Sequence, residues 1–168
     1  ICPVNIVLNS LAQKRGQKYD EDGKIARLGK IDSELLNELN NLKFYRQDFP
    51  KSLGIEWVLE NVSSKFEKQS TEDLLATFTE HSAIQIANTL NQFKLKNVLI
   101  TGGGTYHSYL IEKIKSKTST EIIIPEKTII DYKEALIFAF MGVLKMNNET
   151  NVLASATGSY ENHSSGII

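Results

Sequence analysis

The residues of this chain whose type and spacing point most directly to chemistry are three consecutive glycines, Gly102, Gly103 and Gly104. Glycine lets the backbone approach a ligand without interference from a Cβ atom, and the amides at the start of a following helix can bind an anion. A tight turn needs only one glycine, so three in a row favour a ligand contact over a turn that binds nothing. The spacing does not follow Gly-x-Gly-x-x-Gly, and no Lys-Ser/Thr pair follows, which argues against a dinucleotide fingerprint and a P-loop.

Charged side chains supply further candidates. Asp131 and Glu134 are three residues apart at the predicted start of a helix, where they favour a capping box, although Glu134 can instead reach a ligand. These two roles exclude one another, because a carboxylate bonded to its own helix cannot also contact a ligand. The acidic turn 20–23 lacks the glutamate of a calcium loop, so a solvated turn is expected there. Lys51, in the polar loop 50–54, can meet a phosphate but is more simply a solvated lysine.

The histidines and the single cysteine show no metal-ligand spacing, and no metal site is predicted. Glu80 and His81 are neighbours in a predicted helix and therefore point apart, so His81 is expected to be a surface or hydrogen-bonded histidine and not a catalyst. His163 lies in a polar tail and is assigned no role. Cys2 is the only cysteine, which excludes internal disulfides and fits a reducing compartment.

The glycines lie between two elements that would position them. Residues 98–100 form an apolar run typical of a buried strand, and Leu110, Ile111 and Ile114 recur at helical spacing after the glycines. In open α/β sheets, ligands bind at the carboxyl ends of the strands, which is where such a turn lies. A second strand is predicted over 121–124.

Helices account for most of the remaining chain. They are predicted over residues 4–15, from 32–33 onward, over 55–66, over 70–93 and from 131 onward. The longest can be capped by Ser70 or Thr71 and has an apolar stripe broad enough to pack on a sheet. The helix that begins at Asp131 is apolar nearly all round and is therefore expected to be buried. The order of elements predicts a single α/β domain over residues 1–168 with few strands, which can form half of a larger protein.

Bulk properties restrict the partners. The chain has 168 residues and a formal net charge of −1, so no overall field favours nucleic acid or an anionic membrane. No apolar run approaches the roughly 20 residues that cross a bilayer. We therefore expect no nucleic-acid partner and no membrane association.

Seven segments of the chain together resemble one known family. They are Ile-Cys-Pro-Val-Asn, Tyr-Asp-Glu-Asp-Gly, Pro-Lys-Ser-Leu-Gly-Ile-Glu, Ala-Thr-Phe-Thr-Glu, Gly-Gly-Gly-Thr-Tyr-His, Asp-Tyr-Lys-Glu-Ala-Leu-Ile-Phe-Ala and Leu-Ala-Ser-Ala-Thr-Gly-Ser. In this order and spacing they resemble the C-terminal half of anhydro-N-acetylmuramic acid kinase, a bacterial peptidoglycan-recycling enzyme. The resemblance spans essentially all of the chain but only about half of the family's length.

The resemblance implies a fold and a set of partners. The family is similar to the sugar kinases of the actin and hexokinase superfamily, in which two α/β lobes close over ATP and sugar. This chain would be the second lobe, with a small mixed sheet packed with helices, and the N-terminal lobe would be absent from it. ATP, Mg²⁺ and 1,6-anhydro-N-acetylmuramic acid are the implied cofactors and substrates, and a cytoplasmic homodimer is expected.

The resemblance also implies a reaction and its missing base. Water opens the anhydro ring while O6 of the sugar takes the γ-phosphoryl group of ATP, and an aspartate activates the water. That aspartate would stand immediately before Ile1, so no catalytic residue is predicted in this chain. The family's N-terminal phosphate loop is missing too. We therefore expect the chain by itself to be inactive.

Family roles carry over to a few positions of this sequence. Gly102, Gly103 and Gly104 match the adenosine motif, and Asn5 would shape the phosphate side of the cleft. Glu134 matches an acidic residue that is expected to meet the sugar, which makes this role as plausible as the capping box. At His107 the family frequently has asparagine, which leaves any specific side-chain contact there open.

Two other functions stay open on the sequence. One is a stand-alone nucleotide-binding or dimerisation module without catalysis. The other is a different nucleotide-dependent α/β transferase that uses the glycine turn, although the spacing around Pro125 and Glu126 does not fit a Rossmann site.

Overall fold

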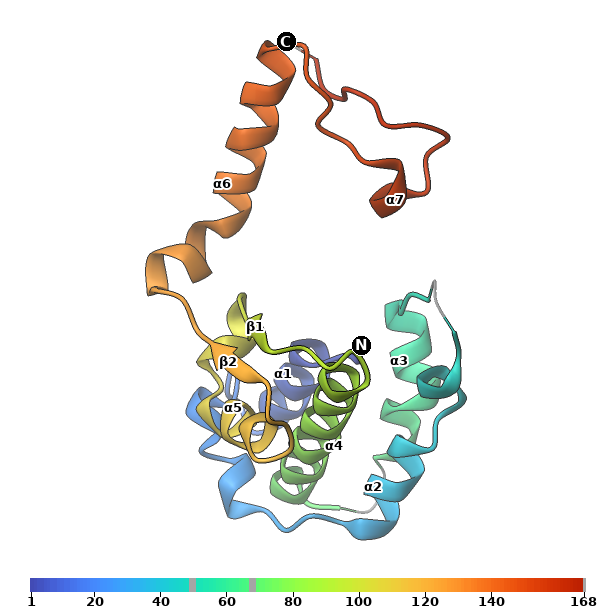
Figure 1. Cartoon of the computed structure of the whole chain (residues 1–168). Helices are drawn as coiled ribbons and strands as arrows, with labels where there is room; N and C mark the ends of the chain where they lie inside the picture. The colour runs from blue at the N-terminus through green and yellow to red at the C-terminus, as the bar shows by residue number, and fades with distance from the viewer. Residues whose placement is uncertain (49–50, 67–68, 168) are drawn as a thin grey trace. The chain divides into compact units, whose positions relative to one another are not determined.

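The structure is a computed structural model that describes residues 1–48, 51–66 and 69–167 (Figure 1). Its helices and strands are α1 (Asn5–Gln13), α2 (Ser33–Asn40), α3 (Ile55–Asn61), α4 (Thr71–Gln92), β1 (Asn97–Leu99), α5 (Ser108–Lys115), β2 (Glu121–Ile123), α6 (Lys127–Met146) and α7 (Ala154–Thr157). They fall into two compact units, residues 1–124 and residues 125–168. Pro50 of the predicted polar loop lies outside the described residues.

Helix α4 is the centre of the first unit. It packs against α1, α2 and α5, as Figure 1 shows for the green helix among its neighbours. Leu75 and Phe78 of α4 are fully buried in a cluster with apolar side chains of α1 and α2. The broad stripe predicted for residues 70–93 is therefore confirmed as a packing surface, and helices cover much of it.

The sheet consists of two parallel strands with α5 between them in sequence. Asn97 pairs with Glu121 and Leu99 pairs with Ile123. One face packs on α4 and α5 through Val98, while Leu99 and Ile123 on the other face are 56% and 40% exposed. The α/β class is confirmed, but the expected mixed sheet is wrong for the described residues, which form a parallel pair only.

Side-chain caps fix two helix starts where the sequence predicts them. The Oδ1 atom of Asp32 accepts hydrogen bonds from the amides of Glu34 and Leu35 at 3.0 and 3.1 Å. The hydroxyl of Ser70 accepts from the amide of Asp73 at 3.1 Å. Each cap satisfies amides that have no partner inside their own helix, so α2 and α4 begin directly after these residues.

Two expectations about the first unit need correction. The helix predicted over 55–66 ends at Asn61, and a separate 3₁₀ helix covers Ser63–Lys65. The acidic turn is not simply solvated, because Asp20 is buried and its carboxylate accepts the amide hydrogens of Ile25 and Ala26 at 2.8 and 2.9 Å. Asp20 therefore holds the chain that comes after the turn.

The second unit contains α6, which begins four residues earlier than predicted. Its first residue is Lys127, and Glu126 precedes it without a side-chain cap. Asp131 lies within the helix and pairs with Lys127 at 2.5 Å. The predicted capping box between Asp131 and Glu134 is therefore wrong, because neither residue is at the helix start.

Helix α6 is also not buried as predicted. Leu136, Phe138 and Phe140 are 59%, 67% and 61% exposed. The polar tail after α6 forms α7 and an antiparallel bridge between Val152 and His163. Within the described residues, no helix is long and apolar enough to cross a membrane.

Candidate functional site

The glycine turn comes directly after β1 and leads through the 3₁₀ helix Gly103–Tyr106 into α5. Gly102 has a φ of +87°, a left-handed conformation that favours glycine over any residue with a Cβ atom. The amide of Thr105 donates to the carbonyl of Gly102 at 3.0 Å and closes the turn. Within the described part of the chain, the amides of Gly103 and Gly104 donate to no acceptor, so a ligand oxygen can accept from them.

Asn5 lies against this turn. A Cβ atom on Gly103 would be 3.2 Å from Nδ2 of Asn5, and one on Gly104 would be 3.2 Å from Oδ1. The first residue of α1 and the turn after β1 therefore meet, although they are far apart in sequence. Part of the need for glycine here comes from the Asn5 side chain itself. Two of the predicted site segments are thus brought together.

A cavity of about 360 Å³ opens beside the glycine turn, and we call it the glycine-turn cavity. Gly102, Gly103, Gly104 and Asn5 supply its polar backbone and amide groups, and Ile86 is among its apolar lining. Apolar walls with a few directed polar groups are typical of small-molecule sites. This combination suits a ligand with an apolar part and a polar part.

A second cavity of about 360 Å³ is lined by Ile1, Cys2 and Pro3 together with the loop 51–55, and we call it the lysine-loop cavity. The ammonium of Lys51 donates to the carbonyls of Phe44 and Gln47 at 3.2 and 2.9 Å. Cys2 lines both cavities, so the N-terminal segment runs between them.

Cys2 itself is not suited to nucleophilic chemistry. Burial raises the pKa of its thiol to about 12, and the thiol donates weakly to the carbonyl of Ser82 at 3.8 Å. A protonated thiol is a poor nucleophile and a poor metal ligand. Cys2 therefore acts as part of the wall between the two cavities.

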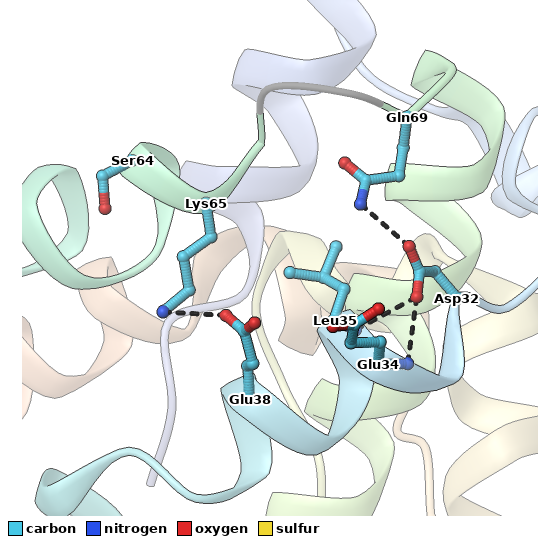
Figure 2. Close-up of a pocket in the computed structure, with 7 residues that line it drawn as sticks. All are labelled: Asp32, Glu34, Leu35, Glu38, Ser64, Lys65 and Gln69. Atoms are coloured by element: carbon cyan, nitrogen blue, oxygen red, sulfur yellow. Dashed lines mark hydrogen bonds and ion pairs between the residues drawn. The ribbon is translucent and has the colours of Figure 1, made fainter.

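A third cavity, of about 350 Å³, has polar walls that the sequence does not predict as a site. Figure 2 shows two contacts between side chains that line it: Lys65 contacts Glu38 at 2.9 Å, and the side-chain amide of Gln69 donates to Asp32 at 2.8 Å. Asp32 is also the cap of α2. These contacts join Lys65 and Gln69 to α2 and its cap, and we assign the cavity no chemistry.

His81 is buried and hydrogen-bonded. Its ring nitrogens lie 2.7 Å from Oδ1 of Asn40 and 3.0 Å from the hydroxyl of Tyr45. Burial lowers the pKa of His81 to about 4, so the ring is neutral at pH 7. The prediction of a hydrogen-bonded histidine is confirmed, and the surface alternative is wrong.

His107 serves a helix start. Its Nδ1 atom accepts a hydrogen bond from the amide of Leu110 at 3.1 Å, which makes His107 the N-cap of α5. Its Nε2 atom lies 3.8 Å from the carboxylate of Asp20. Asparagine is among the strongest N-cap residues, so an asparagine at this position could serve the same role. This role was not predicted from the sequence, although the cap preference of asparagine was an available signal.

Glu134 belongs to the other unit, where it is exposed in the interior of α6. Across residues 1–48, 51–66 and 69–167, no group of three or more His, Cys, Asp or Glu side chains could hold a metal ion.

Comparison with known proteins gives a consistent result. A family model described as Anhydro-N-acetylmuramic acid kinase matches residues 1–168. Proteins of that name from Clostridioides difficile (strain 630) and Haemophilus influenzae are 34% and 31% identical to the chain over 169 and 191 residues. These matches cover 93% and 99% of this chain but 44% and 49% of the relatives. The chain thus spans about half the length of the curated relatives it matches.

Proposed function

Because the chain belongs to the anhydro-N-acetylmuramic acid kinase family over all of residues 1–168, we propose that it is the second lobe of such a kinase. In the proposed reaction, water adds to C1 of 1,6-anhydro-N-acetylmuramic acid and the C1–O6 bond breaks. O6 bonds to the γ-phosphorus of ATP, and ADP leaves. The product is N-acetylmuramic acid 6-phosphate, and the reaction is a step of peptidoglycan recycling in the bacterial cytoplasm. We propose that the active form of the whole protein is a homodimer.

The match to the family over all of residues 1–168 carries this proposal. The contact between Asn5 and the glycine turn adds support, because the family motifs assign both segments to the nucleotide. We place the adenosine in the glycine-turn cavity, against Gly102, Gly103 and Gly104. Asn5 would then border the phosphates, where its side-chain amide can donate to a phosphate oxygen.

The base is proposed to be the aspartate that the family motif places before Ile1. It takes a proton from the attacking water as the C1–O6 bond breaks.

Glu134 is proposed to contact the sugar, and its position away from the start of α6 leaves its carboxylate available for that contact. Mg²⁺ accompanies ATP in such reactions, but the described residues offer no metal cluster, so no Mg²⁺ ligand is assigned to this chain.

The test is ATP-dependent phosphorylation of 1,6-anhydro-N-acetylmuramic acid by the whole protein that contains these residues. We expect N-acetylmuramic acid 6-phosphate and ADP in equal amounts, and no product from residues 1–168 alone. Product from residues 1–168 alone would refute the missing-base mechanism. Adenine-nucleotide binding by the whole protein without any turnover would instead support the stand-alone binding module.

A further inference from the structure

The acidic turn 20–23 carries an inference that rests on the proposed function and extends it. We infer that this turn positions the glycine turn, by way of the start of α5, and so sets the affinity for the nucleotide. Gly23 and Asp20 are the residues responsible. The described residues that line the glycine-turn cavity include neither of them, so both act on the nucleotide through the segment between.

The glycine turn is joined to α5 at His107. The amide of His107 donates to the carbonyl of Gly104 at 3.2 Å, and its Nδ1 atom accepts from the amide of Leu110 at 3.1 Å. The first bond closes the 3₁₀ helix that follows Gly102, and the second begins α5. A displacement of His107 is therefore transmitted to the backbone of Gly104.

The acidic turn packs directly against this junction. Gly23 is buried, and a Cβ atom on it would be 2.5 Å from Cε1 of His107 and 2.5 Å from Cβ of Tyr109. Carbon atoms in contact are about 3.5–4.0 Å apart, so not even a methyl group fits there. The Cβ atom of Tyr109 moves only with its backbone, so a larger residue must push α5 and the turn apart. The hydroxyl of Ser108 also donates to the carbonyl of Asp22 at 3.0 Å.

Asp20 holds the acidic turn in this place. Its buried carboxylate accepts the amide hydrogens of Ile25 and Ala26, which ties the turn to the segment after it. The same carboxylate lies 3.8 Å from Nε2 of His107. Because Nδ1 of His107 accepts a hydrogen, the neutral ring carries its proton on Nε2, next to the carboxylate. Asp20 therefore also attracts the imidazole that caps α5.

A fixed glycine turn raises nucleotide affinity by pre-organisation. Backbone amides that already point to a ligand oxygen bind it without the entropic cost of ordering the turn. If the turn samples other positions, the observed affinity falls with the fraction of molecules in which it is correctly placed. Contacts behind the glycine turn thus change the affinity for the nucleotide without touching it.

The test is the dissociation constant of ADP, measured by isothermal titration calorimetry on the whole kinase and its variants. Gly23→Ala should raise this constant about tenfold or more, because α5 and the glycine turn must shift. Gly16→Ala is the matched control, since Gly16 also has a φ of +72° but a Cβ atom there meets nothing within 4 Å. It should leave the constant unchanged. KM for the anhydro sugar should stay the same in both variants.

Ser108→Ala is a milder variant that decides the question if Gly23→Ala does not fold. Loss of one neutral hydrogen bond between the acidic turn and α5 should raise the dissociation constant of ADP about threefold. Ser116→Ala is its control, because that hydroxyl bonds the carbonyl of Lys113 at the other end of α5. The stoichiometry of each titration reports the folded fraction separately from the affinity.

An unchanged dissociation constant in Gly23→Ala, or in Ser108→Ala if the first variant does not fold, would overturn the inference. Equal increases in Gly16→Ala and Gly23→Ala would also overturn it, because they would trace the effect to backbone strain. A parallel rise in KM for the sugar would do the same by showing a general distortion. An unsubstituted kinase that neither binds ADP nor phosphorylates the sugar would instead refute the proposed function.

Discussion

The neutral imidazole of His81 gives the first unit a defined dependence of stability on pH. Burial lowers the pKa of His81 from 6.5 to about 4 in the folded chain. Between these values the unfolded chain binds a proton that the folded chain does not, so stability falls as the pH falls through this window. The loss of stability from this group is negligible well above pH 6.5 and reaches about 2 kcal/mol at pH 5.

The measurement is the free energy of unfolding at several pH values for the unsubstituted protein and for His81→Gln. The variant can still hydrogen-bond Asn40 and Tyr45 but has no proton to bind. Its loss of stability between pH 6.5 and pH 5 should be smaller, with a remainder from His107, whose pKa burial also lowers. His163→Gln, at an exposed site, is the control. Equal pH dependence in His81→Gln and the unsubstituted protein would contradict the assignment.

The cap at His107 makes a second prediction at the scale of single residues. Loss of an N-cap side chain costs about 1 kcal/mol, so His107→Ala should lower the free energy of unfolding by that amount. His107→Asn can still accept the amide hydrogen of Leu110 and should cost clearly less. Chemical denaturation of both variants at pH 7.5 decides the matter, since the imidazole is neutral there. An asparagine variant as unstable as the alanine variant would show that burial of the ring, and not the cap, is what matters.

Single residues were predictable where the signal was local. Asp32 and Ser70 are recognised as caps from their own type and from the helical pattern after them, and both cap their helices. The burial of Asp20 and the contact of Asn5 with Gly103 depend on long-range packing, which local sequence does not encode. His81 was expected to be hydrogen-bonded or exposed, and only the fold decides between these environments.

At the scale of elements, Glu80 joins α4 to α5. Its carboxylate contacts the ammonium groups of Lys113 and Lys117 at 3.1 and 2.5 Å. Burial by itself would raise the pKa of Glu80, but the hydrogen bonds and charges of the two lysines outweigh it and lower the pKa. The side chain is only 11% exposed, so the pair is shielded from solvent and salt.

Removing this charge should therefore weaken the contact between the helices. Hydrogen bonds to charged groups contribute roughly 1.5–3 kcal/mol, so we expect Glu80→Gln to lower the free energy of unfolding by about 2 kcal/mol. Glu38→Gln removes the partner of Lys65 in a more exposed pair and should cost less than about 1 kcal/mol. Urea denaturation of both variants tests this order. Equal costs would mean that burial adds nothing to the Glu80 pairs.

The glycine turn supplies another prediction for an element. Alanine at Gly102 must adopt a φ of +87°, which should cost about 1–2 kcal/mol. Alanine at Gly103 meets only the side-chain amide of Asn5, which is exposed and can shift. We therefore expect Gly102→Ala to destabilise the fold more than Gly103→Ala, measured by thermal unfolding. The reverse order would show that the approach of Asn5, and not the backbone conformation, limits the turn.

The start of α6 shows where prediction of elements fails. Asp131 resembles an N-cap with an acidic partner three residues later, and this pattern is sufficient to suggest a helix start. The helix nevertheless begins at Lys127, because nothing in the segment Glu126–Asp131 interrupts a helix. A capping pattern identifies a possible start but cannot exclude an earlier one.

At the scale of the molecule, the hydrophobicity of a segment predicts that it is buried but not which other segment packs against it. The sequence predicts burial of α6, yet Leu136, Phe138 and Phe140 are more than half exposed. The outer face of the sheet likewise exposes Leu99 and Ile123, although parallel sheets normally have both faces covered. Such surfaces can only be assigned from a structure, because periodicity carries no information about distant segments.

The exposed side chains of α6 predict how residues 1–168 behave as an isolated chain. Contiguous apolar surface beyond a few hundred Å² binds hydrophobic dyes and promotes association. We therefore expect the chain to enhance 8-anilinonaphthalene-1-sulfonate fluorescence and to self-associate as its concentration rises. The double variant Leu136→Ser, Phe140→Ser should reduce both, as measured by fluorescence and by sedimentation velocity. Leu28→Ser removes a single exposed leucine of the first unit and serves as the control. If the double variant changes neither property, the exposed side chains of α6 do not cause the dye binding or the association. Another apolar surface, such as the outer face of the sheet, must then be responsible.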